Sequence, residues 1–505
     1  MNTIISGFIS ELTSRSISFL IDRYLKPIPY KKDTIQRLQW MLLRVHLMVE
    51  EADGRCLTNL AMLQQLNIVR RVMYKGYYML DNFIQHVPEE EHIKEQAVSC
   101  SLSLSKLRPA KRVCFSTGSK YGTGNLEEML ESLENTIAGM NELLIFLRNY
   151  PPMFRQPYST YLFMEKCMFG RQMEMERIIN FLLYEDAPAH CHFGILPIVG
   201  PAKVGKTTLV EHVCRDERVR DHFSHVIFLS SSEFSGENEL KIRDGSRTKH
   251  EHGESNEEKE LVIIEIIGTI DEVACRKLHS ASQSSIPRGS KVIITSQSEN
   301  IINIGTTQAI NLKFLSREAY WYFFKALVFG SAYPEEHPRL ASIAMEIFDE
   351  CFDQDIYKAF AGLFIFLHKT AMGLKSSVNV QNWNKILECF KNNRRQNEPG
   401  FRKRLSEHGM MNDDHILLQR VSDSTQYCVV HNHDRIALVN EKAPKITLHD
   451  ILDGTGSVKP HSKFDIVVWE SHLPPYHKYI YSCQILEFDC NVTKNKQSQK
   501  RKFSS

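Results

Sequence analysis

The sequence contains no run of about 18 consecutive apolar residues, the length that a membrane-spanning helix needs. The 12 cysteines include no C-x-x-C pair, so neither the spacing of a zinc site nor a disulfide framework is visible. Across 505 residues the net charge is only +2, which gives no reason to expect a nucleic-acid partner. We therefore expect a cytoplasmic protein, and its length predicts about two to four domains.

The first 150 residues are predicted to be helical. Apolar residues recur there at intervals of three and four, which places them on one face of a helix. One series is Ile35, Leu38, Leu42, Val45 and Val49, and a second is Leu126, Leu130, Leu133, Ile137, Met140, Leu144 and Leu147. A further helix is expected over residues 60–84. A long coiled coil is one interpretation, but each series lasts only about three heptads, which favours a short bundle.

From residue 192 onward, short apolar runs alternate with helical segments. The runs at 193–199, 226–229, 261–267 and 291–295 are predicted as buried strands, and 206–214 as a helix. Apolar strands that alternate with helices predict a parallel sheet covered on both faces. The polar segment 233–260 is predicted to be a surface loop.

The predicted fold class is therefore multidomain. An N-terminal α-helical bundle is expected at residues 1–150, and a linker at 151–165 leads to a central α/β P-loop nucleotide-binding domain with a parallel sheet at 166–312. A helical domain follows at 313–395, and a mixed C-terminal region at 396–505 ends in a basic tail from residue 494. Short strands are expected in that last region at 427–430, 436–439 and 466–469.

One segment between the first predicted strand and the helix after it carries a chemical motif. It matches G-x-x-x-x-G-K-[ST], in which glycines let backbone N–H groups turn toward phosphate oxygens. The lysine is expected to reach the β- and γ-phosphates, and the hydroxyl of Thr207 to ligate Mg²⁺. The motif predicts an ADP or ATP site formed by Gly200, Pro201, Ala202, Lys203, Val204, Gly205, Lys206, Thr207 and Thr208.

The apolar strand at 261–264 ends in Glu265, whose carboxylate is expected, beside Thr207, to contribute to the outer shell of the metal. In P-loop NTPases such an acid is often followed by another that polarises water. Here the next residue is Ile266, whose hydrocarbon side chain cannot orient water. We expect nucleotide binding with weak or no hydrolysis. Two alternatives remain open: an active P-loop ATPase with an acid from elsewhere in the sheet, and an interaction-only scaffold that has lost nucleotide binding.

With these motifs the sequence resembles the plant intracellular immune receptors, which join a coiled-coil-type N-terminal bundle to an NB-ARC nucleotide switch. The resemblance covers roughly residues 1–390. Apart from the P-loop, it is carried by Phe169-Gly170-Arg171, the strand motifs at 222–230 and 289–296, the helix at 312–326, and the N-terminal segment 73–81. It implies a role in plant defence, with the N-terminal bundle contacting a full-length receptor, a guarded host protein or a second copy.

The sequence departs from this family at several switch positions. Gln297 stands where the family has an arginine that senses the γ-phosphate. Residues 360–364 lack the proline of the family's Gly-Leu-Pro-Leu motif, and Asp81 is all that remains of an acidic contact motif. Leu448-His449-Asp450 partly matches the family's His-Asp sensor. After residue 400 no leucine-rich repeat recurs at a period of about 20–29 residues, so we expect a truncated form lacking the repeats.

Overall fold

The computed structural model divides the chain into two compact units, Met1–Tyr161 and Leu162–Ser505, and each is described by itself. The predicted linker from residue 152 onward, Leu448 and His449 of the sensor-like segment, and the basic tail lie outside the described residues. Among the described helices, none has the length and apolarity to cross a bilayer. The described residues are 32–55, 57–85, 123–151, 169–184, 193–230, 246–249, 259–266, 289–330, 334, 337–354, 362–397, 416–420, 426–437, 446, 450, 463–470 and 478–487.

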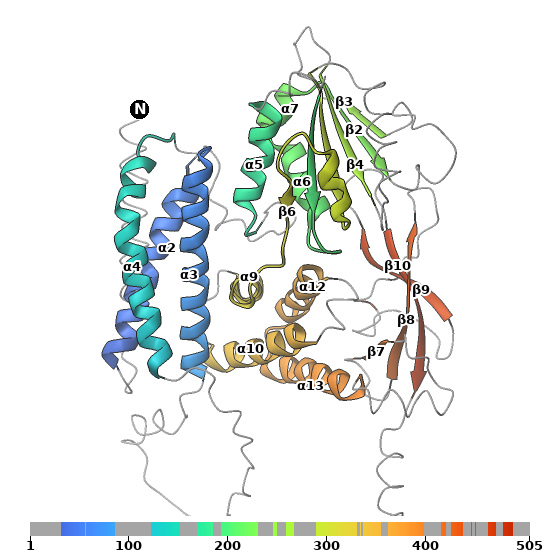
Figure 1. Ribbon diagram of the computed structural model, residues 1–505. Helices are drawn as coiled ribbons and strands as arrows, with labels where there is room; N and C mark the ends of the chain where they lie inside the picture. The colour runs from blue at the N-terminus through green and yellow to red at the C-terminus, as the bar shows by residue number, and fades with distance from the viewer. Residues whose placement is uncertain are drawn as a thin grey trace, which may run out of the picture. The chain divides into compact units, whose positions relative to one another are not determined.

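In the first unit three long helices, α2 (Lys32–Asp53), α3 (Leu60–Gln85) and α4 (Thr123–Leu147), each pack against the other two (Figure 1). All five residues of the first predicted apolar series are buried. The second series is buried except at Leu144, which is half-exposed while its neighbour Leu143 is buried. The prediction of a helical N-terminal region is confirmed, and its described helices pack as a short bundle.

The second unit is built on a six-stranded sheet with the order β3-β2-β4-β5-β1-β6. All strand pairs are parallel except that of β3, which runs antiparallel to β2 at the sheet's edge. The edge strand β3 and Glu260, the first residue of β4, fall within the predicted surface loop 233–260, so the prediction was wrong for those five residues. The strands are β1 (Gly194–Val199), β2 (His225–Ser230), β3 (Ser246–Lys249), β4 (Glu260–Glu265), β5 (Lys291–Ser296) and β6 (Ile310–Asn311).

Both faces of this sheet are covered, as the apolar strands predict. Alternate strand residues such as Ile198 and Ile263 pack on one face with three helices, α5 (Gln172–Leu183), α6 (Lys206–Arg215) and α7 (Glu217–His222). Residues of the opposite parity, such as Val199 and Ile264, pack on the other face with Ile301 of the short 3-10 helix η5 (Glu299–Ile304). The central parallel sheet between helices is thus confirmed.

Among the described residues, four helices follow the sheet: α9 (Arg317–Phe329), α10 (Pro338–Asp353), α12 (Leu363–Ser376) and α13 (Val380–Gln396). Their common core is aromatic: Trp321 lies edge-on to Phe348, with 5.4 Å between ring centroids, and both side chains are fully buried. The Ser316 hydroxyl caps α9 by accepting a hydrogen bond from the Ala319 amide.

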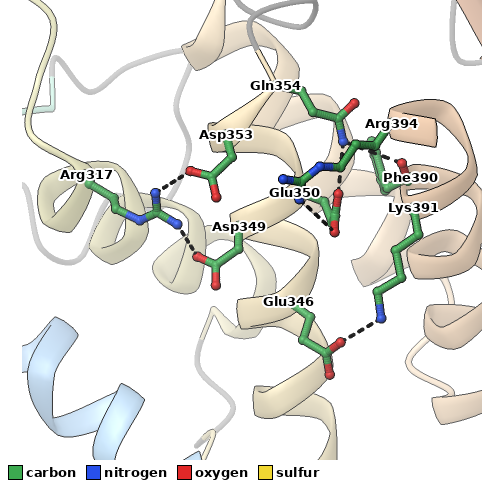
Figure 2. Close-up of polar contacts among 9 residues, drawn as sticks. All are labelled: Arg317, Glu346, Asp349, Glu350, Asp353, Gln354, Phe390, Lys391 and Arg394. Carbon is green, nitrogen blue, oxygen red and sulfur yellow. Dashed lines mark hydrogen bonds and ion pairs between the residues drawn. The ribbon is translucent and has the colours of Figure 1, made fainter. Parts of the chain in front are cut away.

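Acidic side chains on α10 form ion pairs with helices on both of its sides, as Figure 2 shows. Arg317 of α9 contacts Asp349 at 2.6 Å, and Lys391 of α13 contacts Glu346 at 2.8 Å. Burial raises the pKa of Asp349, although Arg317 opposes that rise. Partly exposed pairs of this kind are each worth about 0–1 kcal/mol, so the aromatic core contributes more to holding the helices together.

The chain then forms an antiparallel sheet, ordered β7-β8-β10-β9, of strands β7 (Ile416–Gln419), β8 (Gln426–Ala437), β9 (Lys463–Glu470) and β10 (Lys478–Glu487). Its edge strand β7 is covered by α13, whose Asn393 and Asn397 accept hydrogen bonds from the Gln419 and Leu417 amides at 2.7 and 3.2 Å. These hydrogen bonds occupy backbone amides of the β7 edge that could otherwise pair with a strand of another chain.

Alanine substitutions at two glycines in the helices of the bundle are predicted to change its free energy of unfolding in opposite directions. A methyl group at Gly76 of α3 would lie 2.5 Å from Leu42 Cδ2, and Leu42 is only 1% exposed, so it cannot move aside freely. A methyl group at the exposed Gly139 of α4 would meet nothing within 4 Å. We expect Gly76→Ala to lower the bundle's free energy of unfolding by about 1–3 kcal/mol through overpacking. Gly139→Ala should raise it by about 0.5–1 kcal/mol through helix propensity.

Hydrogen exchange of the α2 and α3 amides in the full-length chain measures both effects. Changes of the same sign in the two variants would contradict the close packing of Gly76 on Leu42.

Candidate functional site

The phosphate-loop motif lies at the carboxyl end of β1, between the ends of β5 and β6. The Gly200 amide donates to the Ser296 carbonyl of β5 at 3.3 Å, and the Leu312 amide donates to the Val199 carbonyl at 2.8 Å. A Cβ on Gly200 would lie 2.6 Å from the Leu312 carbonyl oxygen, so the connection after β6 can approach the loop only because this residue is glycine.

Two residues of the loop have left-handed backbone conformations. Gly205, the N-cap of α6, has φ +96°, which glycine adopts without steric cost. Lys203 has φ +61° and is the one non-glycine residue with positive φ among those described. Between them Val204 is fully buried in the core beneath the sheet, whereas Pro201 and Ala202 are exposed. The loop is therefore anchored at Val204 and open at its outer rim.

The side chain of Lys206 folds back across the loop. Its Nζ donates to the carbonyl oxygens of Gly200 and Pro201, both at 2.8 Å. Burial lowers the pKa of Lys206 to about 8, and the nearby Glu265 carboxylate opposes that shift. The ammonium group is thus partly desolvated at the mouth of the loop, where it would gain from an anionic partner.

The two predicted metal ligands lie together. The hydroxyl of Thr207, in the first turn of α6, donates to Glu265 Oε1 at the end of β4 over 2.6 Å. A hydroxyl and a carboxylate are hard oxygen donors of the kind that Mg²⁺ prefers, and Mg²⁺ usually takes its remaining ligands from phosphate and water. Among the described residues no group of three or more His, Cys, Asp or Glu could hold a metal. The pair fits a metal that arrives with phosphate.

Ile266, the residue after Glu265, lies on the side of the sheet away from α6. Ile266 is 6% exposed and packs in the core cluster on the sheet face opposite α6, while its amide donates to the Thr295 carbonyl at 2.9 Å. Gln297, directly after β5, is exposed. Glu265 is therefore the acid that the described residues place beside Thr207.

Arg171, from the Phe169-Gly170-Arg171 motif at the start of the domain, links the start of α5 to the connection after β6. Its side chain is only 3% exposed, and its Nη2 donates to the Lys313 carbonyl oxygen at 2.5 Å. Since Leu312 touches Gly200, this bond fixes one wall of the loop.

All nine predicted loop residues and Glu265 thus lie at one edge of the sheet. Thr208 is half-buried in the first turn of α6, next to Thr207. Sequence patterns did not reveal three neighbours of the loop: Leu312 against Gly200, Gly362 against Lys203, and Tyr481, whose hydroxyl accepts a hydrogen bond from Lys203. The last two come from distant segments that carry no phosphate-binding motif.

The NB-ARC domain family matches residues 171–333. Among curated proteins, disease resistance protein RGA2 of Solanum bulbocastanum is 29% identical over 199 residues, covering 36% of this chain and 20% of the relative. The putative disease resistance RPP13-like protein 1 of Arabidopsis thaliana is 23% identical, covering 69% of this chain and 34% of the relative. The chain therefore spans about a fifth to a third of the length of these two relatives. Residues 171–333 thus match the NB-ARC domain family, and the chain is similar over part of its length to plant disease-resistance proteins.

Proposed function

We propose that this chain binds ADP or ATP with Mg²⁺ at the loop formed by residues 200–208, and that it acts in plant defence. The observation that carries the proposal is the meeting of three groups at one sheet edge: the ammonium of Lys206, the hydroxyl of Thr207 and the carboxylate of Glu265. Together they supply a cation for phosphate and two oxygen ligands for a metal.

The phosphates would lie at the start of α6. The first turn of a helix leaves backbone N–H groups without intrahelical partners, and the helix dipole adds positive potential there. Lys206 would exchange its two carbonyl partners for phosphate oxygens, which are charged acceptors and form stronger bonds. Mg²⁺ would be held by Thr207 directly and by Glu265 directly or through water.

We further propose that turnover is weak or absent. Hydrolysis needs a group that orients water toward the γ-phosphate. The chain has Ile266 beside Glu265, and its side chain packs in the apolar core. The exposed Gln297 brings no charge to the γ-phosphate. Bound nucleotide would then act as a structural ligand whose binding free energy stabilises the folded domain.

The defence role would be exerted in the cytoplasm through protein contacts of the N-terminal bundle. Candidate partners are a full-length receptor, a guarded host protein or a second copy of this chain. The helices of that bundle carry exposed apolar side chains, including Ile68 on α3 and Phe146 on α4, which suit protein contact. The similarity to disease resistance proteins supports this part of the proposal.

Lys206→Ala should weaken ADP and ATP binding by about a hundredfold, because the variant loses charge-assisted bonds to phosphate. Isothermal titration with the purified full-length chain measures the dissociation constants. Lys385→Ala, which removes an exposed lysine on α13, is the matched control and should bind as the wild type does. Equal affinities of wild type and Lys206→Ala would refute the proposed site, and no binding by the wild type at millimolar nucleotide would favour the scaffold alternative.

ADP affinity should fall as pH rises from 7 to 9. The pKa of Lys206 is about 8, so before nucleotide binds its side chain is mostly charged at pH 7 and mostly neutral at pH 9. Bound phosphate favours the charged form, so binding above pH 8 requires proton uptake, and the dissociation constant should rise roughly tenfold. Lys206→Arg keeps its charge throughout this range and should give a flat profile, whatever its absolute affinity. A flat profile in the wild type would contradict the assignment of Lys206.

ATP bound with Mg²⁺ should remain intact. Phosphate release from the wild-type chain should not exceed that from Lys206→Ala, since Ile266, which follows Glu265, cannot orient water. A single-turnover assay with radiolabelled ATP measures this directly. Release by the wild type that disappears in Lys206→Ala would instead establish the active ATPase alternative.

A further inference from the structure

Lys203 has a conformation that its side chain disfavours. With φ +61° its backbone is left-handed, and there the Cβ atom of a non-glycine residue crowds the following carbonyl. The neighbouring Gly205 meets the same demand without a Cβ. Such a strained residue persists only where its surroundings hold it in place.

One side of Lys203 is held by Gly362, the N-cap of α12. Gly362 has φ +81°, and a Cβ there would lie 2.7 Å from the Cβ of Lys203, which no real pair of Cβ atoms tolerates. Glycine at 362 thus lets the helical region come into direct contact with the phosphate loop.

The far end of Lys203 is held by Tyr481 of β10. The ammonium Nζ donates to the Tyr481 hydroxyl at 3.2 Å, across a separation of 278 residues in the sequence. Nζ lies 5.9 Å from the ring centroid, near the outer limit of a cation–π contact, so the hydroxyl is the stronger attachment.

Tyr481 itself is fixed firmly. It is 2% exposed, and β10 lies between β8 and β9, where Tyr481 is paired with Asp434 on one side and Ile466 on the other. A hydroxyl on an inner strand of a sheet has far less freedom than one on a surface loop, so it can hold a neighbouring side chain in one position.

We propose that Tyr481 is a positioning residue for the phosphate loop. By holding Lys203 in the left-handed conformation, it keeps the backbone amides of the loop turned toward the place of the phosphates. The proposal rests on nucleotide binding at residues 200–208. Because coupling between two sites is reciprocal, nucleotide in the loop would also stabilise the packing of the C-terminal sheet against it.

Tyr481→Phe removes only the hydroxyl and tests this role in the full-length chain. ADP should bind about five- to tenfold more weakly to this variant, whereas adenosine, which has no phosphate, should bind equally to both proteins. The matched control is Tyr479→Phe, which removes a hydroxyl from a half-buried tyrosine of the same strand and should leave both affinities unchanged.

A Lys203→Gly background separates positioning from general destabilisation. Glycine adopts the left-handed conformation unaided and has no ammonium to hold, so Tyr481→Phe should cause no further loss of ADP affinity there. Provided that the wild type binds ADP, an equal loss in both backgrounds, or no loss in the wild-type background, would overturn the proposal.

Hydrogen exchange of the loop amides in nucleotide-free protein separates this proposal from the proposed function. If the loop amides exchange faster in Tyr481→Phe than in the wild type, with no such difference in the Lys203→Gly background, the positioning role is supported. This holds even if the wild type binds no ADP, because failure to bind would contradict only the proposed nucleotide site. Unchanged exchange on removal of the hydroxyl would overturn the positioning role.

Discussion

The parallel hydrogen-bonded ladder from β1 through β5 to β4 aligns Val199 with Ser296 and Glu265 with Thr295. In a parallel sheet the carboxyl ends of the strands meet at one edge, so this register brings the loop after β1 and the acid that ends β4 to the same place. The 2.6 Å contact between Thr207 and Glu265 is a consequence of that register. A slip of one residue in β4 would turn the carboxylate to the other face of the sheet and separate the pair.

The core that fixes this register is apolar, whereas the loop above it is polar and strained. Residues on both faces of the inner strands, such as Ile263 and Ile264, are almost wholly buried, and each such side chain contributes about 1.5–3 kcal/mol. This rigid support makes left-handed residues at the loop tolerable, since strain of about 1–3 kcal/mol at Lys203 is small beside the burial below it. Val204, fully buried between Lys203 and Gly205, joins the two layers.

Sequence patterns predicted the inner strands, because each is apolar on both faces and punctuated by loops. They missed β3, whose residues Ser-Arg-Thr-Lys carry no apolar signal, because backbone pairing with β2 alone defines it. In the C-terminal sheet the runs predicted at 427–430 and 436–439 belong to one strand, β8, which bulges opposite Ser482 of β10. The contacts of Gly362 and Tyr481 with Lys203 could not be predicted, because they join segments far apart in the sequence and no local pattern encodes them.

Within the loop, Lys206 hydrogen-bonds to backbone carbonyl oxygens, and this affects which ligands the loop would favour. Lys206 donates to two carbonyl oxygens at 2.8 Å, so a ligand must replace both of these neutral bonds. A bond to a charged oxygen is roughly twice as strong as a bond to a neutral one, so the exchange is favourable only for a well-charged anion that reaches Nζ. A ligand with several phosphates can do this while its metal contacts Thr207, whereas a small monoanion would have to break the same bonds without the metal's contribution. Under the proposed function, these two bonds of Lys206 would make the site favour polyphosphate over small monoanions.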